Sequence, residues 1–335
     1  MKSKTNMNLL AKIRSVTKDD DNLPRYSYSG LSLLKQCPYE FNLRYIEGKR
    51  STETTLPLQL GTLLHYVLEQ KGKMLRTGSV DYNELNNILH NGTTVTDDKT
   101  QEAIIGLDEL KKIYWESWGI TDSEGRTYND KLELFEDVLH TEMESDDWKP
   151  VLFEHPFEFV YDDKIVLHGF IDRVDMKNGE YRVVDYKTNK KLFDPKDLPT
   201  SMQFGIYAMA ILNEFGVLPV EFQYRMILID KCQYALTTGW EKRLIKVIDD
   251  LIKILEESKM TGIWTPKPTP LCHWCNYCKT NPDANDYKNE CIYHSLWTPN
   301  NKTYEVYTTF EDKKVNSKTK YPTNNTGQSG RKVIF

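Results

Sequence analysis

Several familiar signatures are absent from this sequence. No stretch of the 335 residues approaches the ~20 consecutive apolar residues of a membrane-spanning helix, so we expect no membrane association. The first ten residues are polar and lack the apolar centre of a secretory signal, which predicts a cytoplasmic protein. The phosphate-binding pattern G-x-x-x-x-G-K-[ST] is also missing, which excludes an ATP-driven motor of the P-loop class.

An excess of basic residues is missing as well. Lys and Arg total 44 against 49 Asp and Glu, for a net charge of −5. This balance neither identifies nor excludes a nucleic-acid-binding protein, because a binding groove needs a local basic field rather than a basic total. Hydrophobic residues make up 39%, which is an ordinary globular proportion and supports one large domain or two smaller ones.

Cysteine is scarce, with six residues in total, but it is concentrated. In a reducing compartment a C-x2-C-x2-C run indicates metal or cluster ligation before disulfides. The spacing allows a zinc site or an iron–sulfur cluster. The candidate zinc ligands are Cys272, Cys275, Cys278 and Cys291. Cys232 follows a predicted strand, and we expect it to be a buried structural residue.

The chain divides into five segments by composition and periodicity. They are a flexible lead-in (1–25), a helical part (26–148), an α/β core (149–260), a cysteine-cluster segment (261–298) and a polar, disordered tail (299–335). Within the helical part, residues 80–148 are predicted to be mostly helical. The core is predicted to contain strands at 151–161, 164–176, 180–188 and 220–230, and helices at 202–215 and 242–258. This order predicts an α/β sheet flanked by helices.

The predicted strands carry one constellation with chemical meaning. Asp185 and Lys187 are two residues apart and therefore face the same side of a strand. If the Asn178-Gly179 turn pairs two strands, Asp172 lies near them. Two buried carboxylates repel each other unless a cation lies between them, and oxygen ligands favour Mg²⁺ or Mn²⁺. The alternative is a surface hairpin with an ordinary ion pair, but the apolar residues around both carboxylates disfavour it.

Five pieces of the sequence together resemble the RecB-like PD-(D/E)XK nucleases, which include RecB and AddB nuclease domains and CRISPR-associated RecB-like exonucleases. They are "YSYSGLSLLKQCPYEFNLRYI", "LGTLLHYVLE", "HGFIDRVD", "VVDYKT" and "SMQFGIYAMA", in the family's order. The resemblance covers roughly residues 26–295. It implies a restriction-endonuclease-like core sheet flanked by helices, with a helical block before it and a cysteine-cluster segment after it.

The resemblance also implies roles for individual residues. It makes Asp172, Asp185 and Lys187 catalytic, together with Gln203 and Tyr207, which are one turn apart on one helix face. It makes His65 a metal ligand beside Asp172 and Asp185. Taken alone, His65 could be an ordinary helix histidine, and Gln203 with Tyr207 a packed helix face. Glu154, on the first core strand, either lies near the metal or covers the sheet edge.

For the cysteines the resemblance implies a [4Fe–4S] cluster, with one ligand before the nuclease core and three after it. The implied ligands are Cys37, Cys272, Cys275 and Cys291, with Cys278 as an alternative. Zinc is the alternative metal. An iron–sulfur cluster would join the two ends of the nuclease domain.

The expected function is a metal-dependent DNA exonuclease acting on single strands or DNA ends, in recombination, repair or phage DNA processing. Its expected partners are DNA and a helicase or other recombination protein, in the cytoplasm of the cell or of a phage host. The alternatives are a structure-specific or restriction endonuclease, a non-catalytic DNA-binding or scaffolding module, and a zinc-stabilised interaction protein. Basic residues near the motifs are candidate phosphate contacts, although exposed lysines are more often solvated: Lys187, Lys190, Lys191, Arg44, Lys49 and Arg50.

Overall fold

The structure, a computed structural model, describes two compact units. The described residues are 4–51, 54–96, 101–122, 125–144, 147–235, 240–278, 287–288 and 290–291, with four short strands between 303 and 334. Unit 1 comprises residues 1–28 and 54–248, and unit 2 comprises residues 29–53 and 249–335. Within the described residues, no helix is both long enough and apolar enough to span a membrane.

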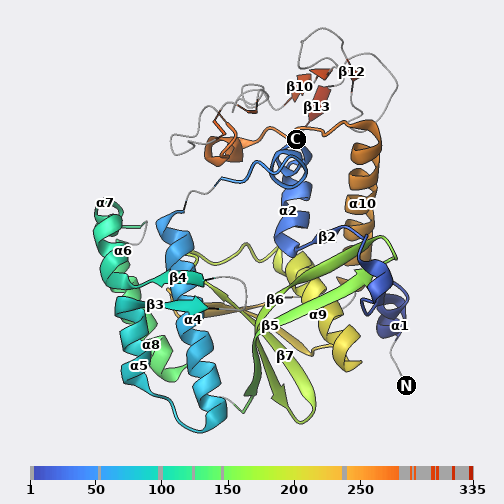
Figure 1. The fold of residues 1–335 in the computed structure, drawn as a ribbon. Coiled ribbons are helices and arrows are strands. Elements are labelled where there is room, and N and C mark those ends of the chain that lie inside the picture. Colours follow the sequence, from blue (N-terminus) through green and yellow to red (C-terminus); the bar gives the residue numbers. More distant parts are fainter. Residues whose placement is uncertain are drawn as a thin grey trace. The chain divides into compact units, whose positions relative to one another are not determined.

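A mixed sheet of seven strands forms the centre of unit 1 (Figure 1). Its strand order is β1-β5-β6-β7-β8-β9, and β2 pairs in parallel with β6. The strands are β1 (Ile13–Arg14), β2 (Arg25–Tyr26), β5 (Lys149–Tyr161), β6 (Ile165–Lys177), β7 (Glu180–Lys187), β8 (Glu221–Met226) and β9 (Lys231–Tyr234). All neighbouring strands on this path are antiparallel except β7 and β8, which are parallel.

Two tight turns set the register of the three longest strands. Asp162 and Asp163 have φ values of 54° and 53°, and Asn178 and Gly179 have φ values of 53° and 84°. Left-handed backbone at both central residues matches the right-handed twist of a hairpin, and Asp, Asn and Gly adopt it most easily. The β-hairpin predicted from Asn178-Gly179 is therefore confirmed, and Asp162-Asp163 forms a second turn between β5 and β6.

Helices cover both faces of this sheet. One face packs against α4 (Leu56–Thr77), α5 (Tyr82–Asn91), α6 (Leu107–Ile113), α7 (Trp115–Trp118) and α8 (Tyr128–Thr141), whose buried residues form one core with Val184 and Tyr186 of β7. The opposite face carries α9 (Met202–Phe215) (Figure 1). Gln203 and Tyr207 of α9 donate hydrogen bonds to Asp185. Alternate residues of β7 therefore contact different helices, as the two-residue period of a strand requires.

The segment 80–148 contains a β-hairpin that the helical prediction missed. Strands β3 (Gly92–Thr96) and β4 (Gln101–Ile105) pair between α5 and α6. The apolar stripe at Ile104, Leu107 and Leu110 has helical spacing, yet the helix begins only at Leu107. The reason is the pairing of β4 with a threonine-rich β3, because a β-branched run favours a strand and periodicity alone does not reveal the partner.

The described part of the predicted flexible lead-in (1–25), residues 4–25, forms regular secondary structure. Helix α1 (Lys4–Leu10) buries Leu9, and a short helical turn, η1 (Lys18–Asp20), follows β1. Strand β1 pairs Ile13 with Tyr161 of β5. The pairing depends on residues almost 150 positions away, so local composition did not reveal it.

Unit 2 joins two distant segments of the chain. Its first segment contains most of α2 (Tyr28–Gln36), then α3 (Pro38–Phe41) and a π-helical turn, η2 (Asn42–Ile46). Its second contains the end of α10 (Trp240–Thr261), a 3₁₀ turn, η4 (Pro270–Trp274), and the strand pairs β10 (Thr303–Glu305) with β13 (Lys332–Ile334) and β11 (Tyr307–Thr308) with β12 (Thr319–Lys320). Most of the predicted disordered tail, 299–335, lies outside the described residues.

Candidate active site

Strands β6 and β7 place Asp172 and Asp185 opposite each other. Their antiparallel register pairs Arg173 with Val184, so the two aspartates occupy the next pair of positions. The backbone N–H of Tyr186 donates a hydrogen bond to a carboxylate oxygen of Asp172 at 2.7 Å. The structure therefore brings together the two carboxylates that the sequence pattern singled out.

Asp185 is held by two side chains of α9. The Gln203 amide donates to Oδ1 of Asp185 at 2.8 Å, and the Tyr207 hydroxyl donates to the same oxygen at 3.3 Å. The Gln203 amide also donates to the Tyr207 oxygen at 3.0 Å. The carboxylate is 1% exposed, and burial raises its pKa, with the nearby charge of Asp172 adding to the shift and Lys187 opposing it.

Lys187 forms an ion pair with Oδ2 of Asp185. Burial lowers the pKa of Lys187, but the charges of Asp185 and Asp172 outweigh burial, and the net shift is upward. The side chain is therefore an ammonium group at neutral pH. The Lys187 ammonium is the partner of this buried Oδ2, and a carboxylate oxygen has a second lone pair that a cation could use.

His65, on α4, lies next to the carboxylate of Asp172. Its Nδ1 lies 3.5 Å from Oδ2 of Asp172, and its ring meets the ring of Tyr186 edge-on at 6.0 Å. Thr55 precedes α4, and Gly78 ends it with a φ of 114°. Buried leucines and Val67 along one stripe of α4 fix the rotation of the helix, so that His65 faces the carboxyl end of β7.

Glu154 of β5 lies close to His65 and Asp172 and is the third candidate metal ligand. The neighbouring pairs Phe153–Arg173 and His155–Ile171 set it opposite Asp172. Its φ of 40° is unusual for a residue other than glycine. Burial raises its pKa to about 8, and the charges of Asp172, Glu69 and Asp185 add to the shift. The sequence left its role open, and a two-residue turn at Asp162-Asp163 would have set it opposite Ile171, because the structure pairs Tyr161 with Ile165 and leaves three residues in the turn.

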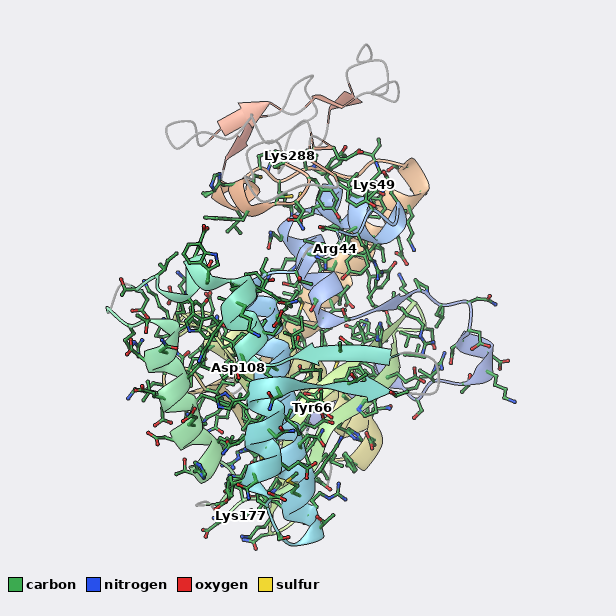
Figure 2. All side chains as sticks on the ribbon, turned by 60° about the vertical axis from the view of Figure 1, so that its left-hand side comes forward. Arg44, Lys49, Tyr66, Asp108, Lys177 and Lys288 are labelled. Atoms are coloured by element: carbon green, nitrogen blue, oxygen red, sulfur yellow. The ribbon has the colours of Figure 1, made fainter. Side chains whose placement is uncertain are left out.

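A groove in unit 1 gives solvent access to these ligands. Its wall includes the exposed side of α4, the end of β4 and the residue that follows β7. The lining residues are Pro57, Leu58, Gly61, Thr62, His65, Tyr66, Glu69, Ile104, Glu154, Asp172 and Thr188. Figure 2 labels Tyr66 on α4, beside the hairpin of β3 and β4. A substrate can therefore reach the carboxylates without a change of the fold.

The donor set fits a divalent cation. One ring nitrogen of His65 and one carboxylate oxygen each of Glu154 and Asp172 lie within 4.8 Å of one another. Asp185, which the sequence placed with His65 and Asp172, is not in this group, because Lys187 and α9 hold its carboxylate. Two carboxylates with one imidazole suit Mn²⁺ or Mg²⁺, and the pKa of Glu154 is raised mainly by burial, with the charges of Asp172, Glu69 and Asp185 adding to the shift.

A buried ionic network supports β6 and β7 on the face opposite α9. Arg173 donates to the Tyr186 hydroxyl at 2.6 Å and to Glu142 at 2.7 Å, and it pairs with Asp175 at 2.9 Å. Arg225 of β8 donates to the other oxygen of Glu142 at 2.8 Å. All five side chains are at most 9% exposed. The network thus fixes Tyr186, whose backbone N–H holds Asp172.

A family model supports the interpretation of this geometry. The model described as the PD-(D/E)XK nuclease superfamily matches residues 25–280, which is more than half of the chain.

The chain belongs to the PD-(D/E)XK nuclease superfamily.

The curated relatives are much longer proteins of one kind. Each is named as a component of an ATP-dependent helicase/deoxyribonuclease. The protein of Streptococcus uberis is 28% identical over 176 residues, which cover 50% of this chain and 14% of the relative. That of Streptococcus agalactiae serotype Ia is 31% identical over 183 residues (52% and 15%), and that of Clostridium acetobutylicum is 26% identical over 215 residues (56% and 18%). The chain thus matches less than a fifth of each relative.

A solved structure has a similar arrangement. A candidate exonuclease from Eubacterium rectale aligns with a TM-score of 0.44 and 12% sequence identity, covering 80% of this chain and 93% of that one. Together with the family model, the mixed sheet flanked by helices confirms the predicted fold class.

Five cysteines line one cavity in unit 2. They come from the two distant segments: Cys37, Cys272, Cys275, Cys278 and Cys291. Successive turns bring the later ones together, because the N–H of Cys275 bonds to the carbonyl of Cys272 at 3.2 Å and that of Cys278 to Cys275 at 3.0 Å. Burial raises the pKa of Cys37 to about 12, and Cys291 is close enough to add to the shift. The cavity therefore contains every cysteine that the sequence analysis named as a ligand.

Two cysteines differ in environment from the rest. The Cys278 thiol is fully buried and makes hydrogen-bond contacts with Cys272, Cys275 and Cys291. Cys232, by contrast, is exposed on β9 and does not line the cavity. The prediction that Cys232 is buried was wrong, because β9 ends the strand order of the sheet and this residue points to solvent.

Proposed function

We propose that this protein is a divalent-metal-dependent DNA nuclease that acts as an exonuclease on single strands or DNA ends. The observation that carries the proposal is the meeting of His65, Glu154 and Asp172 in an open groove, next to the buried Asp185–Lys187 pair. Histidine, carboxylates and an ammonium group are what hydrolysis of a phosphodiester requires: cation ligands, and a positive charge near the developing negative charge.

Each residue has a proposed role at this site. Glu154, Asp172 and His65 bind the cation, and Asp185 lies beside them as a further carboxylate ligand once Lys187 turns toward the substrate. A bound Mg²⁺ or Mn²⁺ supplies Lewis acidity and lowers the pKa of a water molecule. Lys187 donates to a nonbridging phosphate oxygen and orients the attacking water.

Two side chains of α9 position this machinery. Gln203 and Tyr207 hold Oδ1 of Asp185, which keeps the other oxygen directed at Lys187 and the cation. Removal of either should therefore weaken catalysis less than removal of Asp185. We expect both to act on the orientation of the carboxylate rather than on the reacting phosphate.

The biological setting follows from the relatives. Their name couples a deoxyribonuclease to an ATP-dependent helicase. We therefore propose that the protein works with a separate helicase or recombination protein, in recombination, repair or phage DNA processing. A structure-specific endonuclease on the same site is the alternative within the enzyme class.

For unit 2 we propose a [4Fe–4S] cluster bound by Cys37, Cys272, Cys275 and Cys291. The support for this cluster is that cysteines from both chain segments line one cavity, since a cluster needs four thiolate ligands. Cys278 is the alternative ligand, and its contacts with three other cysteines also suit a zinc site. Five free thiols in one cavity are compatible with the reducing cytoplasm, where we place the protein.

The test of nuclease function compares linear and circular single-stranded DNA. The purified protein with Mn²⁺ should degrade linear strands and spare closed circles, and EDTA should stop the reaction. Asp185→Asn and Lys187→Ala should each lower the rate by about 10³-fold or more, since they remove transition-state interactions. Lys231→Ala, which removes an exposed lysine of β9, is the control and should retain most activity.

Rapid cutting of circles would replace the exonuclease by an endonuclease. Full activity in Asp185→Asn, or equal activity in EDTA, would overturn the assigned centre. Substitution by Asn keeps the size of the buried side chain, and a melting curve confirms that any loss of rate is not loss of fold.

A further inference from the structure

A stack of aromatic rings holds the π-helical turn η2 rigidly in unit 2. Trp264 packs on Phe41 at 5.8 Å, and Phe41 stacks on Tyr45 at 5.0 Å with an angle of 25° between the rings. Phe41 is fully buried and Trp264 is 8% exposed. Tyr45, at the end of this stack, is therefore a fixed platform on the surface. π-Helical turns of this kind are frequent at functional sites.

Two arginines share the Tyr45 ring. The guanidinium carbons of Arg44 and Arg50 lie 5.9 Å and 5.3 Å from its centroid. Gly48, with a φ of 71°, makes the turn that returns Arg50 to the ring, and the N–H of Lys49 bonds to the carbonyl of Leu43 at 2.9 Å. Each contact is within the range of a cation–π interaction. The backbone thus places two like charges beside one ring.

Neither guanidinium is engaged by an ion pair of its own. Within the described residues, no hydrogen bond or ion pair holds the side chain of Arg44 or Arg50, and both residues are exposed. Lys49, between them, differs: its ammonium pairs with Glu47 at 2.9 Å and with Glu290 at 2.8 Å. All three were expected to contact phosphate, but Lys49 is ion-paired, whereas Arg44 and Arg50 have no hydrogen bond or ion pair within the described residues, although the charge of Arg44 also acts on Glu40. Figure 2 labels Arg44 and Lys49 in this part of unit 2.

We propose that Arg44 and Arg50, ordered by Tyr45, form a contact surface for the phosphate backbone of a nucleic-acid strand. The inference rests on the proposed nuclease function and adds a substrate contact in unit 2, separate from the groove residues of unit 1. Guanidinium groups bind phosphate in a bidentate manner, and two of them no more than about 11 Å apart can engage phosphates of one strand. Stacking on a fixed ring lowers the entropy that each arginine loses on binding.

The test is binding of a labelled 30-nucleotide oligo(dT) to the full-length protein, in metal-free buffer so that cleavage does not interfere. R44A/R50A should raise the Kd about tenfold at low salt. It should also reduce the slope of log Kd against log salt by about 1.4, because each single-strand phosphate contact contributes about 0.7. R44K/R50K keeps both charges and should retain the salt slope, but its Kd should rise several-fold because lysine loses the bidentate and stacked geometry. The matched control K242A/R243A removes two exposed charges from α10 and should change the Kd less than twofold.

The outcomes separate this inference from the proposed function. If the wild type binds and cleaves nucleic acid, and R44A/R50A has the same Kd and salt slope as the α10 control, only the arginine surface is overturned. The same result is expected if the two arginines bind an acidic protein instead. A wild-type protein that neither binds nor cleaves nucleic acid overturns both proposals. Unchanged cleavage of a dinucleotide-scale substrate by R44A/R50A, with weaker binding of the 30-mer, supports a contact away from the chemistry.

Discussion

Among single residues, Glu154 combines an unusual backbone with an unusual charge. A left-handed conformation outside glycine costs about 1–3 kcal/mol, and such strain persists where the surrounding structure enforces it. Here the strand pairing enforces it and sets the carboxylate opposite Asp172. A cation that binds the carboxylates of Glu154 and Asp172 would offset both the backbone strain and the repulsion between them.

This arrangement predicts a pH-dependent stabilisation by metal. The folded-state pKa of Glu154 is raised from 4.5 to about 8, so between these values the folded protein binds a proton that the unfolded chain releases. Stability of the metal-free protein should therefore fall as pH rises through this window. Mn²⁺ should oppose the fall, so the difference in Tm between loaded and metal-free protein should widen from pH 6 to pH 8.

Glu154→Gln removes the titrating group and should flatten this dependence. The flattening should be partial, since the raised pKa of Asp185 acts in the same direction. Glu158→Gln, on the same strand but exposed, is the control and should behave as the wild type. A Mn²⁺ effect on Tm that is independent of pH in the wild type would contradict the assignment of Glu154 as a ligand.

Among the elements, β7 connects the face of the sheet that carries Asp185 and Lys187 with the buried network on the other face. Tyr186 stands between Asp185 and Lys187; its backbone N–H holds Asp172, and its hydroxyl accepts from Arg173. Buried charges of this kind add little net stability compared with apolar packing, but they specify geometry. We therefore assign the network a positioning role.

Tyr186→Phe tests that role with minimal change of shape. It should leave the fold intact, with a loss of about 1 kcal/mol for one buried hydrogen bond. The concentration of Mn²⁺ for half-maximal cleavage should rise several-fold, while the rate at saturating Mn²⁺ stays near wild type. Tyr161→Phe, which removes a buried hydroxyl contact to the carbonyl of Ile245, is the matched control. An equal Mn²⁺ dependence in both variants would reduce Tyr186 to a purely structural residue.

The β3–β4 hairpin depends on a glycine at its base, Gly92. A Cβ on Gly92 would lie 2.2 Å from the carbonyl oxygen of Ile104, and Gly92 has a φ of 75°. Gly92→Ala should therefore destabilise the protein by at least about 2 kcal/mol in urea unfolding. Gly119→Ala, where nothing lies within 4 Å of the added Cβ, should stay within about 0.5 kcal/mol. Equal unfolding of the two variants would show that the hairpin base tolerates a side chain.

On the scale of the whole molecule, unit 2 depends on joining residues 29–53 to residues 249–335. Cys37 and Cys272 are 235 residues apart in the sequence but line the same cavity. A cluster bound by both segments would close this long loop, whose entropy cost grows only slowly with length. Cluster loss should thus affect stability and DNA binding rather than the phosphate chemistry.

Cys37→Ala tests the cluster. Anaerobically purified wild type should contain iron and sulfide and absorb broadly near ~400 nm, and the variant should lose both the colour and thermal stability. Cys232→Ala, a cysteine outside the cavity, is the control and should retain the colour. A colourless, zinc-loaded protein that tolerates Cys37→Ala and fails with Cys278→Ala would replace the cluster by a zinc site.

Local sequence determined the parts of this protein that depend on short spacings. The two-residue period of Asp185 and Lys187, the one-turn spacing of Gln203 and Tyr207, and the Asn178-Gly179 turn each fix a relation between near neighbours. Such relations follow from strand and helix geometry, whatever the rest of the chain does. The family resemblance of the five motifs was readable for the same reason, and the family model confirms it.

Only the tertiary structure decided what depends on distant pairing. It set Glu154 beside His65 and Asp172, left Asp185 with Lys187 and α9, and formed the β3–β4 hairpin where apolar spacing had predicted a helix. It also paired Lys49 with Glu290, whereas Arg44 and Arg50 have no hydrogen bond or ion pair within the described residues. Each outcome depends on strand register or on a partner far along the chain. Neither can be predicted from composition or from hydrophobic periodicity.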